Sequence, residues 1–249
     1  MLLWLVFPYD TPVYEKQQGR TENLNILMNK IYASPEIAAE RIDEIKIISE
    51  DDQKDLTYSK LCCDKQYSRA TLVGCLLSVF QTLTGINVIM FYSNMVFKGL
   101  TMSATTVTAL IGIVNFVSTI IGFFFLICFG RKTIMLVFNI LMALSLFLIA
   151  YFSFINDTYG MVACTLLFIV FFEFSSGPIL WLYLAEILQD KAQSIATFLN
   201  WSINLAISIS VPLMVKSFAI GYIFLGLGLI TVLGVVFIIF FMKETKGKT

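Results

Sequence analysis

The side chains best suited to chemistry lie between Phe80 and Asn94, in the sequence FQTLTGINVIMFYSN. This segment belongs to a stretch, 71–97, that contains no charged residue and is long enough to cross a bilayer as a helix. Its amide and hydroxyl side chains are those of Gln81, Thr84, Asn87 and Asn94. Unpaired polar groups are unfavourable in hydrocarbon, and Gly85 weakens the helix in their midst. We therefore expect a broken helix that forms a substrate site at mid-membrane. The alternative is that these amides only join neighbouring helices.

The composition is that of a polytopic membrane protein. Hydrophobic residues make up 58% and charged residues 14% of the chain, and the mean hydropathy is +0.83. These values predict an all-α protein with several apolar helices that cross the membrane. The predicted spans are 71–97, 105–128, 133–154, 161–184, 194–215 and 219–242.

The same composition argues against several other functions. The chain has no His, which removes the commonest general base and metal ligand, and its 5 Cys follow no metal-binding spacing. No nucleophile–base pair stands out, so we predict neither an enzyme nor a metal or other cofactor. No basic or acidic tail indicates nucleic acid as a partner.

The distribution of charge predicts the organisation of the chain. Residues 1–8 are apolar but too short to span, and they are typical of the end of a membrane helix whose beginning is missing. Residues 9–70 are polar and predict short amphipathic helices at the cytoplasmic face. The six-helix region follows at 71–242, with a cytoplasmic tail at 243–249. Of the 17 Lys and Arg, all but Lys98 and Lys216 fall on one side of these spans, which places both termini in the cytoplasm.

The segment around Gly85 resembles the seventh membrane helix of the sugar porters, a family of the major facilitator superfamily with the pattern QQLSGINxxxYYS. A later segment, FFEFSSGPILWLYLAEI from Phe171 to Ile187, is similar to the tenth helix of that family. The tail sequence ETKG also resembles the family pattern. The resemblance covers nearly the whole chain as the C-terminal half of such a protein, helices 7–12. It implies the major facilitator fold and alternating access around a central sugar site.

Three candidate residues leave more than one interpretation open. Glu173 is the ionisable residue inside a predicted span, and such a group is functional by default. It could couple protons, contact substrate or form half of a gating ion pair. Asn115 is similar to a family asparagine that meets sugar hydroxyls, yet polar stripes also serve helix packing. Trp181 suits stacking on a sugar ring, with a plain packing role as the alternative.

The resemblance and the polar pattern together give the candidate residues. Amides suit sugars because each offers a donor and an acceptor to a hydroxyl. The predicted sugar site consists of Gln81, Asn87, Asn115, Glu173, Trp181 and Asn204. The predicted gating network at the cytoplasmic end consists of Arg131, Lys132, Glu186 and Glu244.

The expected partners are a small sugar and membrane lipid, together with an N-terminal half on the same or another chain. The rival interpretation is a non-transporting regulatory or degenerate half-transporter that acts through protein contacts. Departures from the family pattern favour the rival: Val13 replaces an arginine, Thr82 the second glutamine and Ile127 a loop acid.

Overall fold

The computed structural model describes residues 11–17, 19–32, 34–44, 64–90 and 104–246. The predicted end of a truncated helix at residues 1–8 and the polar side chain of Asn94 lie outside the described residues. The chain divides into two compact units, Met1–Lys60 and Leu61–Thr249. Each unit is described by itself.

The described residues of the first unit form short helices: α2 (Pro12–Gln17), α3 (Thr21–Ile31) and α4 (Pro35–Glu44). Leu24, Met28 and Ala38 make its small apolar core, because they recur on the facing sides of α3 and α4. Ile31, by contrast, is 55% exposed. The Nζ of Lys16 donates a hydrogen bond to the carbonyl of Ile42, which joins the first of these helices to the last.

Among its described residues, the second unit holds six helical stretches that are long and apolar enough to cross a membrane. They comprise α7 (Lys65–Leu83), α9 (Ala104–Cys128), α10 (Arg131–Phe154), α11 (Thr158–Phe174) with α12 (Pro178–Ile187), α13 (Asp190–Ser217) and α14 (Ile220–Phe241). At 1.5 Å per residue, α10 is about 36 Å long, which exceeds the hydrocarbon core of a bilayer. The predicted all-α membrane fold is confirmed.

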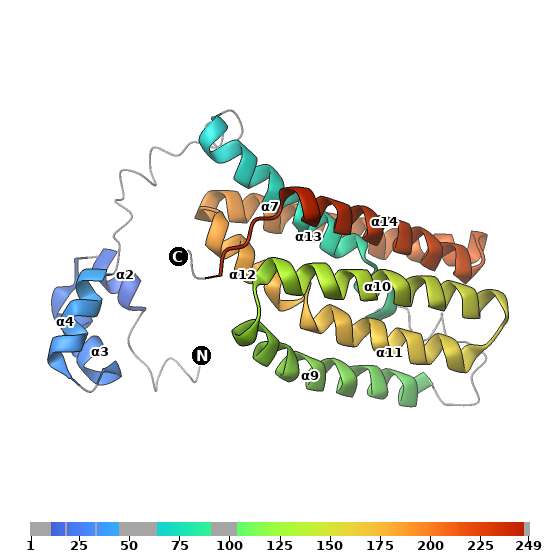
Figure 1. Ribbon diagram of the computed structural model, residues 1–249, viewed down its shortest axis with the longest axis horizontal. Coiled ribbons are helices and arrows are strands. Elements are labelled where there is room, and N and C mark those ends of the chain that lie inside the picture. The colour runs from blue at the N-terminus through green and yellow to red at the C-terminus, as the bar shows by residue number, and fades with distance from the viewer. Residues whose placement is uncertain (1–10, 18, 33, 45–63, 91–103, 247–249) are drawn as a thin grey trace. The chain divides into compact units, whose positions relative to one another are not determined.

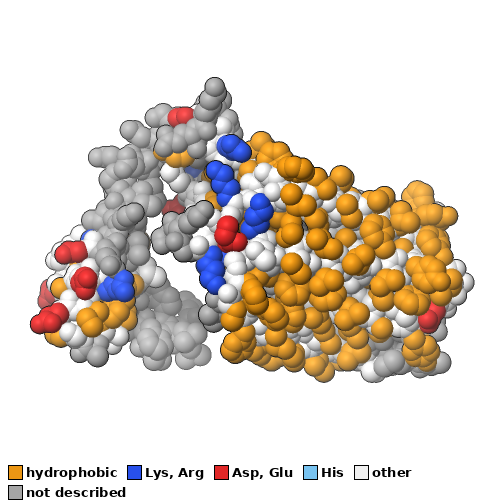
Figure 2. All heavy atoms as spheres, in the orientation of Figure 1, with side chains coloured by type: hydrophobic (Ala, Val, Ile, Leu, Met, Phe, Trp, Pro, Cys, Tyr) orange, Lys and Arg blue, Asp and Glu red, His pale blue; other side chains and the backbone are white. Residues whose placement is uncertain are grey.

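Hydrophobic side chains cover the visible face of this unit, whereas Lys and Arg gather where α10 begins and α14 ends (Figure 2). α10 lies at the centre, alongside α14 and α11 (Figure 1). α9 packs on α11, and α13 packs on α7. The helices α9 and α13 are the least covered, with 17% and 11% of their apolar windows buried.

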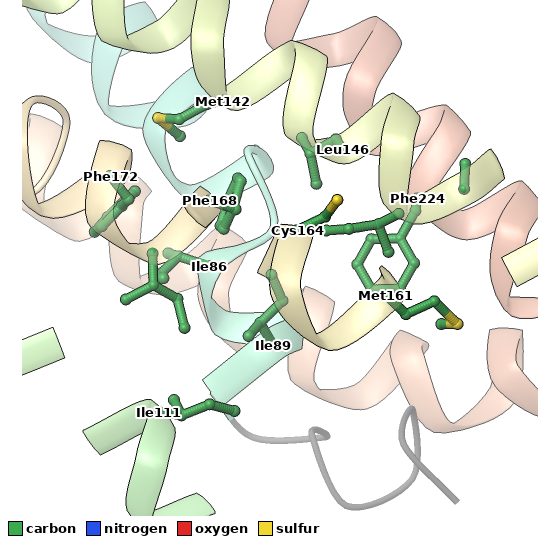
Figure 3. Close-up of a cluster of buried hydrophobic side chains, with 13 residues drawn as sticks. Ile86, Ile89, Ile111, Met142, Leu146, Met161, Cys164, Phe168, Phe172 and Phe224 are labelled. Atoms are coloured by element: carbon green, nitrogen blue, oxygen red, sulfur yellow. The ribbon is translucent and has the colours of Figure 1, made fainter. Parts of the chain in front are cut away.

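The first span is broken at Gly85, as the sequence predicted. α7 ends at Leu83, Gly85 adopts a φ of +94°, and helical structure resumes at Ile86. Two features require glycine at this position. Its positive φ disfavours other residues, and a Cβ here would lie 2.6 Å from Cδ1 of Leu227 on α14. Beyond the break, Ile86 and Ile89 join the cluster of apolar side chains around Phe168 (Figure 3).

The fourth span is broken as well, between Phe174 and Pro178. α12 begins with Pro178 in its first turn, where proline fits because its missing N–H needs no partner. In the break, the N–H groups of Ser175 and Gly177 both donate to the carbonyl of Phe172, at 3.1 and 3.0 Å. The Gly-Pro pair therefore divides this span into two helices, so that Glu173 and Trp181 lie on different ones.

Candidate functional site

Gln81 near the end of α7 is joined to α13 by an amide–amide hydrogen bond. The Nδ2 of Asn200 donates to Oε1 of Gln81 at 2.9 Å and to Oγ1 of Thr82 at 2.6 Å. It also lies 3.1 Å from the carbonyl of Ser78. Asn200 is 6% exposed, so these contacts are shielded from solvent and from lipid. Asn200 on α13 thus provides a donor for the polar groups near the end of α7.

Asn204 lies one turn further along α13 and is 9% exposed. Its Oδ1 is buried without a hydrogen-bond partner among the residues that the structure describes. A buried acceptor of this kind costs about 1–3 kcal/mol when unpaired, so a ligand donor that reached it would be favoured. Of the predicted sugar-site residues that the structure describes, Asn204 is the one with a fully buried polar atom that has no partner.

Asn115 and Glu173 form the second polar contact between helices. The Nδ2 of Asn115 donates to Oε1 of Glu173 at 2.8 Å, and Oγ1 of Thr119 donates to Oε2 at 2.9 Å. Both donors lie one turn apart on α9, whereas the acid belongs to α11. Gly122 allows this approach, because a Cβ there would be 2.6 Å from the backbone oxygen of Glu173. The carboxylate therefore accepts from a neutral amide and a neutral hydroxyl.

Trp181 and Asn87 occupy different surroundings. Trp181 on α12 is partly buried against the apolar cluster that includes Leu77 and Ile134. Asn87 lies just after the Gly85 break and is partly buried. The structure thus joins Asn115 to Glu173 and Gln81 to the helix of Asn204, but the hydrogen bonds among described residues link neither pair to Asn87 or Trp181.

The predicted gating residues meet at one end of the second unit. Nη2 of Arg131 lies 3.0 Å from Oε1 of Glu186, and its Nε lies 3.2 Å from the same atom. Their side chains are 19% and 12% exposed, so the ion pair is partly shielded from solvent. It joins the start of α10 to the end of α12, the second half of the broken span.

Glu244 completes this network from the segment after α14. Its carboxylate accepts from the backbone N–H groups of Arg131 at 2.8 Å and Lys132 at 3.2 Å. These are orphan donors of the first turn of α10, since Gly130 before them has no capping side chain. Burial opposes ionisation, but the N–H groups of Lys246, Arg131, Lys132 and Thr245 lower the pKa of Glu244 below its ordinary value. The Nζ of Lys132 itself donates to the carbonyl of Ile239 at 2.9 Å.

Several residues that complete these contacts were not among the predicted sites. Thr119 and Asn200 lie on the same polar stripes as Asn115 and Asn204, so helical spacing was the signal that could have identified them. Asn139, a buried amide on α10, lies in a span whose other residues are mostly apolar. Its isolation in sequence gave no periodic pattern, although a single amide in a membrane helix is itself a signal.

The six spans, the two broken helices and the buried amides define the class of the protein: an integral membrane protein with polar contacts between its helices. The family described as "Sugar (and other) transporter" matches residues 1–249. The chain is 30% identical over 264 residues to Hexose transporter 1 of Plasmodium knowlesi, covering 99% of this chain and 52% of that protein. It is 36% identical over 188 residues to the facilitated trehalose transporter Tret1 of Drosophila grimshawi, covering 70% and 20%.

Solved structures give the same result. The proton:xylose symporter XylE bound to 6-bromo-6-deoxy-D-glucose matches with a TM-score of 0.78 and 26% identity, over 99% of this chain and 54% of that chain. An inward-open structure of XylE from E. coli matches with a TM-score of 0.71 and 25% identity, over 99% and 52%. The chain belongs to the sugar transporter family of the major facilitator superfamily, a family of transporters and not of enzymes. It spans about half the length of the curated relatives that it matches along its whole length, 52% of one and 46% of another.

Proposed function

We propose that this chain carries a hexose or related sugar across a membrane by alternating access, as the half that corresponds to helices 7–12 of its family. The family and its sugar-transporting relatives supply the substrate class. The observation that carries the proposal is the buried, unpartnered Oδ1 of Asn204, one turn from the Asn200–Gln81 contact. A sugar hydroxyl both donates and accepts, so it matches an amide whose carbonyl lacks a donor.

The other residues of the predicted sugar site fall into two groups. Gln81, Asn87 and Trp181 would add amide contacts and an aromatic face for the ring. Asn115 and Glu173 hold each other at 2.8 Å, which favours a helix-joining role that positions α9 against α11. A sugar that used either residue would have to exchange that hydrogen bond for one of its own hydroxyls.

An N-terminal half, on the same polypeptide or on a partner, would complete the pathway. The exposed faces of α9 and α13 support this, since large apolar side chains such as Phe116 and Phe198 are 68% and 71% exposed there. Lipid would cover part of this surface and the second half the remainder. The excess of Lys and Arg on one side of the spans supports cytoplasmic termini, with 9–70 and 243–249 on that side.

Reconstitution tests the proposal. The chain is co-expressed with an N-terminal half from its family and placed in liposomes, and uptake of radiolabelled hexose is measured. We expect saturable uptake that Asn204→Ala and Asn87→Ala reduce at least tenfold. Ser202→Ala is the matched control, because this exposed hydroxyl on α13 donates only within its own helix, to Phe198. Folded protein without saturable sugar uptake or binding would refute the proposal.

A second candidate is a non-transporting half that regulates a partner protein. The observation in its favour is that Gln81, Asn115 and Glu173 already have hydrogen-bond partners within the chain. A scaffold of this kind needs no sugar, so it predicts no hexose binding in the folded protein. Hexose binding that Asn87→Ala abolishes would exclude it.

A further inference from the structure

A small cavity lies beside Gln81, on the side of α7 that meets α10 and α14. The centre of a water-sized sphere can occupy about 10 Å³ of this cavity, so the cavity has room for about one water molecule. Its polar lining comes from Gln81, Thr84, Asn139, Ser176 and Thr231. These residues belong to the end of α7, to α10, to the break between α11 and α12, and to α14.

The polar atoms of this lining have bonding capacity left for a ligand. The hydroxyl of Thr84 donates to the carbonyl of Gln81 at 2.7 Å, and that of Thr231 donates to the carbonyl of Leu227 at 2.8 Å. Each hydroxyl oxygen therefore keeps lone pairs that can accept. Both residues are 2% exposed, so neither reaches bulk solvent.

One wall of the cavity is a closed pair of side chains. The Nδ2 of Asn139 donates to Oγ of Ser176 at 3.0 Å, and Oγ of Ser176 lies 3.1 Å from Oδ1 of the same amide, to which it can donate. The Nδ2 also donates to the carbonyl of Met135 at 2.7 Å. Ser176 lies within the break before α12, so this pair fastens the break to α10.

We propose that the cavity holds one ordered water molecule and that, with the Asn139–Ser176 pair, this water forms a polar joint at the break of the fourth span. The water accepts from the amide of Gln81 and donates to the hydroxyl oxygens of Thr84 and Thr231. It thereby links the end of α7 to α14, next to the pair that holds the break against α10. The joint itself involves no sugar, but it shares Gln81 with the proposed sugar site, and the two N–H donors of that amide can serve the water and a sugar separately.

A map of the protein in lipid nanodiscs at about 2 Å tests the water directly. We expect density about 3 Å from Oγ1 of Thr231 and from the amide of Gln81. Thr231→Val should remove it, because the variant keeps the shape and loses the hydroxyl. Thr165→Val is the matched control, since Thr165 is 1% exposed and donates to its own helix at 2.8 Å without lining the cavity. A dry cavity in the parent protein, or density unchanged by Thr231→Val, would overturn the water site.

Hydrogen exchange tests the pair. Ser176→Ala leaves the buried amide oxygen of Asn139 unsatisfied, so the Gly177 and Ile179 amides should exchange about five- to thirtyfold faster. Ser145→Ala, a buried hydroxyl on α10 that donates only to Leu141, should leave them unchanged. The double variant Asn139→Leu with Ser176→Ala should return exchange toward the parent rate, because both partners are then apolar. Equal exchange in Ser176→Ala and Ser145→Ala would overturn the joint, and if the variants fail to fold, the parent map decides.

Discussion

Asn200 and Gln81 join α13 to α7 through a partly buried amide–amide hydrogen bond of 2.9 Å. The contact uses the carbonyl oxygen of Gln81 and leaves the amide donors of that side chain outside it. In Gln81, a residue predicted to bind sugar, the carbonyl oxygen therefore joins two helices, while the amide nitrogen is left to donate to another group. The two interpretations of the amides, helix contact and substrate site, apply to different atoms of one side chain.

Replacing Asn200 by Ala should destabilise the protein by about 1–3 kcal/mol, because Oε1 of Gln81 and the carbonyl of Ser78 both lose a donor in a buried place. Thermal unfolding in detergent measures the effect. Ser202→Ala on the same helix should change the midpoint little, since this residue is exposed. Equal midpoints for the two variants would show that the contact contributes nothing.

The Arg131–Glu186 ion pair should couple α10 to α12. A double-mutant cycle with Arg131→Ala and Glu186→Ala should give a coupling free energy of about 1 kcal/mol, because the pair is only partly shielded from solvent. Arg131→Lys should recover only part of it, since a lysine cannot place two donors on the same carboxylate oxygen. Additive single-variant effects would contradict the prediction.

The docking of Glu244 on α10 should depend on pH. Its pKa in the folded protein lies below the ordinary value of 4.5, so the carboxylate stabilises the fold fully above that value. This contribution is lost as the pH falls through the lowered pKa, when the carboxylate takes up a proton. Amide exchange at Arg131 and Lys132, measured as a function of pH, reports the loss.

Glu244→Gln should remove this pH dependence, because the amide keeps an acceptor but does not titrate in the range. Glu36→Gln, an exposed acid on α4, should leave the profile of those two amides unchanged. An identical pH profile in Glu244→Gln and the parent protein would show that another group titrates there.

Gly85→Ala should destabilise the protein by about 2–4 kcal/mol, from a strained positive φ and from contact with Leu227. Gly112→Ala on α9 is the control, since nothing lies within 4 Å of the added Cβ. That change should be neutral or slightly stabilising, because alanine is the better helix former. The free energies of unfolding in mild detergent compare the two variants.

The sequence allowed the spans and the break at Gly85 to be predicted, because hydropathy and that glycine act locally. It also identified Glu173 and Asn115 as polar groups in apolar surroundings. Their direct pairing was not predictable, since it depends on the rotation of α9 about its axis and on the close approach that Gly122 permits. Helical spacing fixes which side chains share a face but not which neighbouring helix that face meets.

Asn139 shows a different limit of sequence reasoning. Its span is mostly Leu, Phe, Ile and Met, so its single amide forms no polar stripe. The partner Ser176 lies in a helix break 37 positions away, so the role of either residue could not be predicted without knowing that the two are in contact. The same limit applies to the tail. Its resemblance to a family pattern pointed to Glu244, but only the three-dimensional structure shows that this residue caps α10.

The carboxylate of Glu244, which caps the first turn of α10, lies 113 positions after Arg131, whose backbone N–H donates to it. During synthesis, α10 enters the membrane with these N–H groups uncapped, and they remain so until the segment after α14 has left the ribosome. The beginning of the central helix is therefore among the last parts of this unit to be completed. A ribosome that stalls before Glu244 would leave a chain with all six spans but with a frayed end on the helix that packs against α11 and α14.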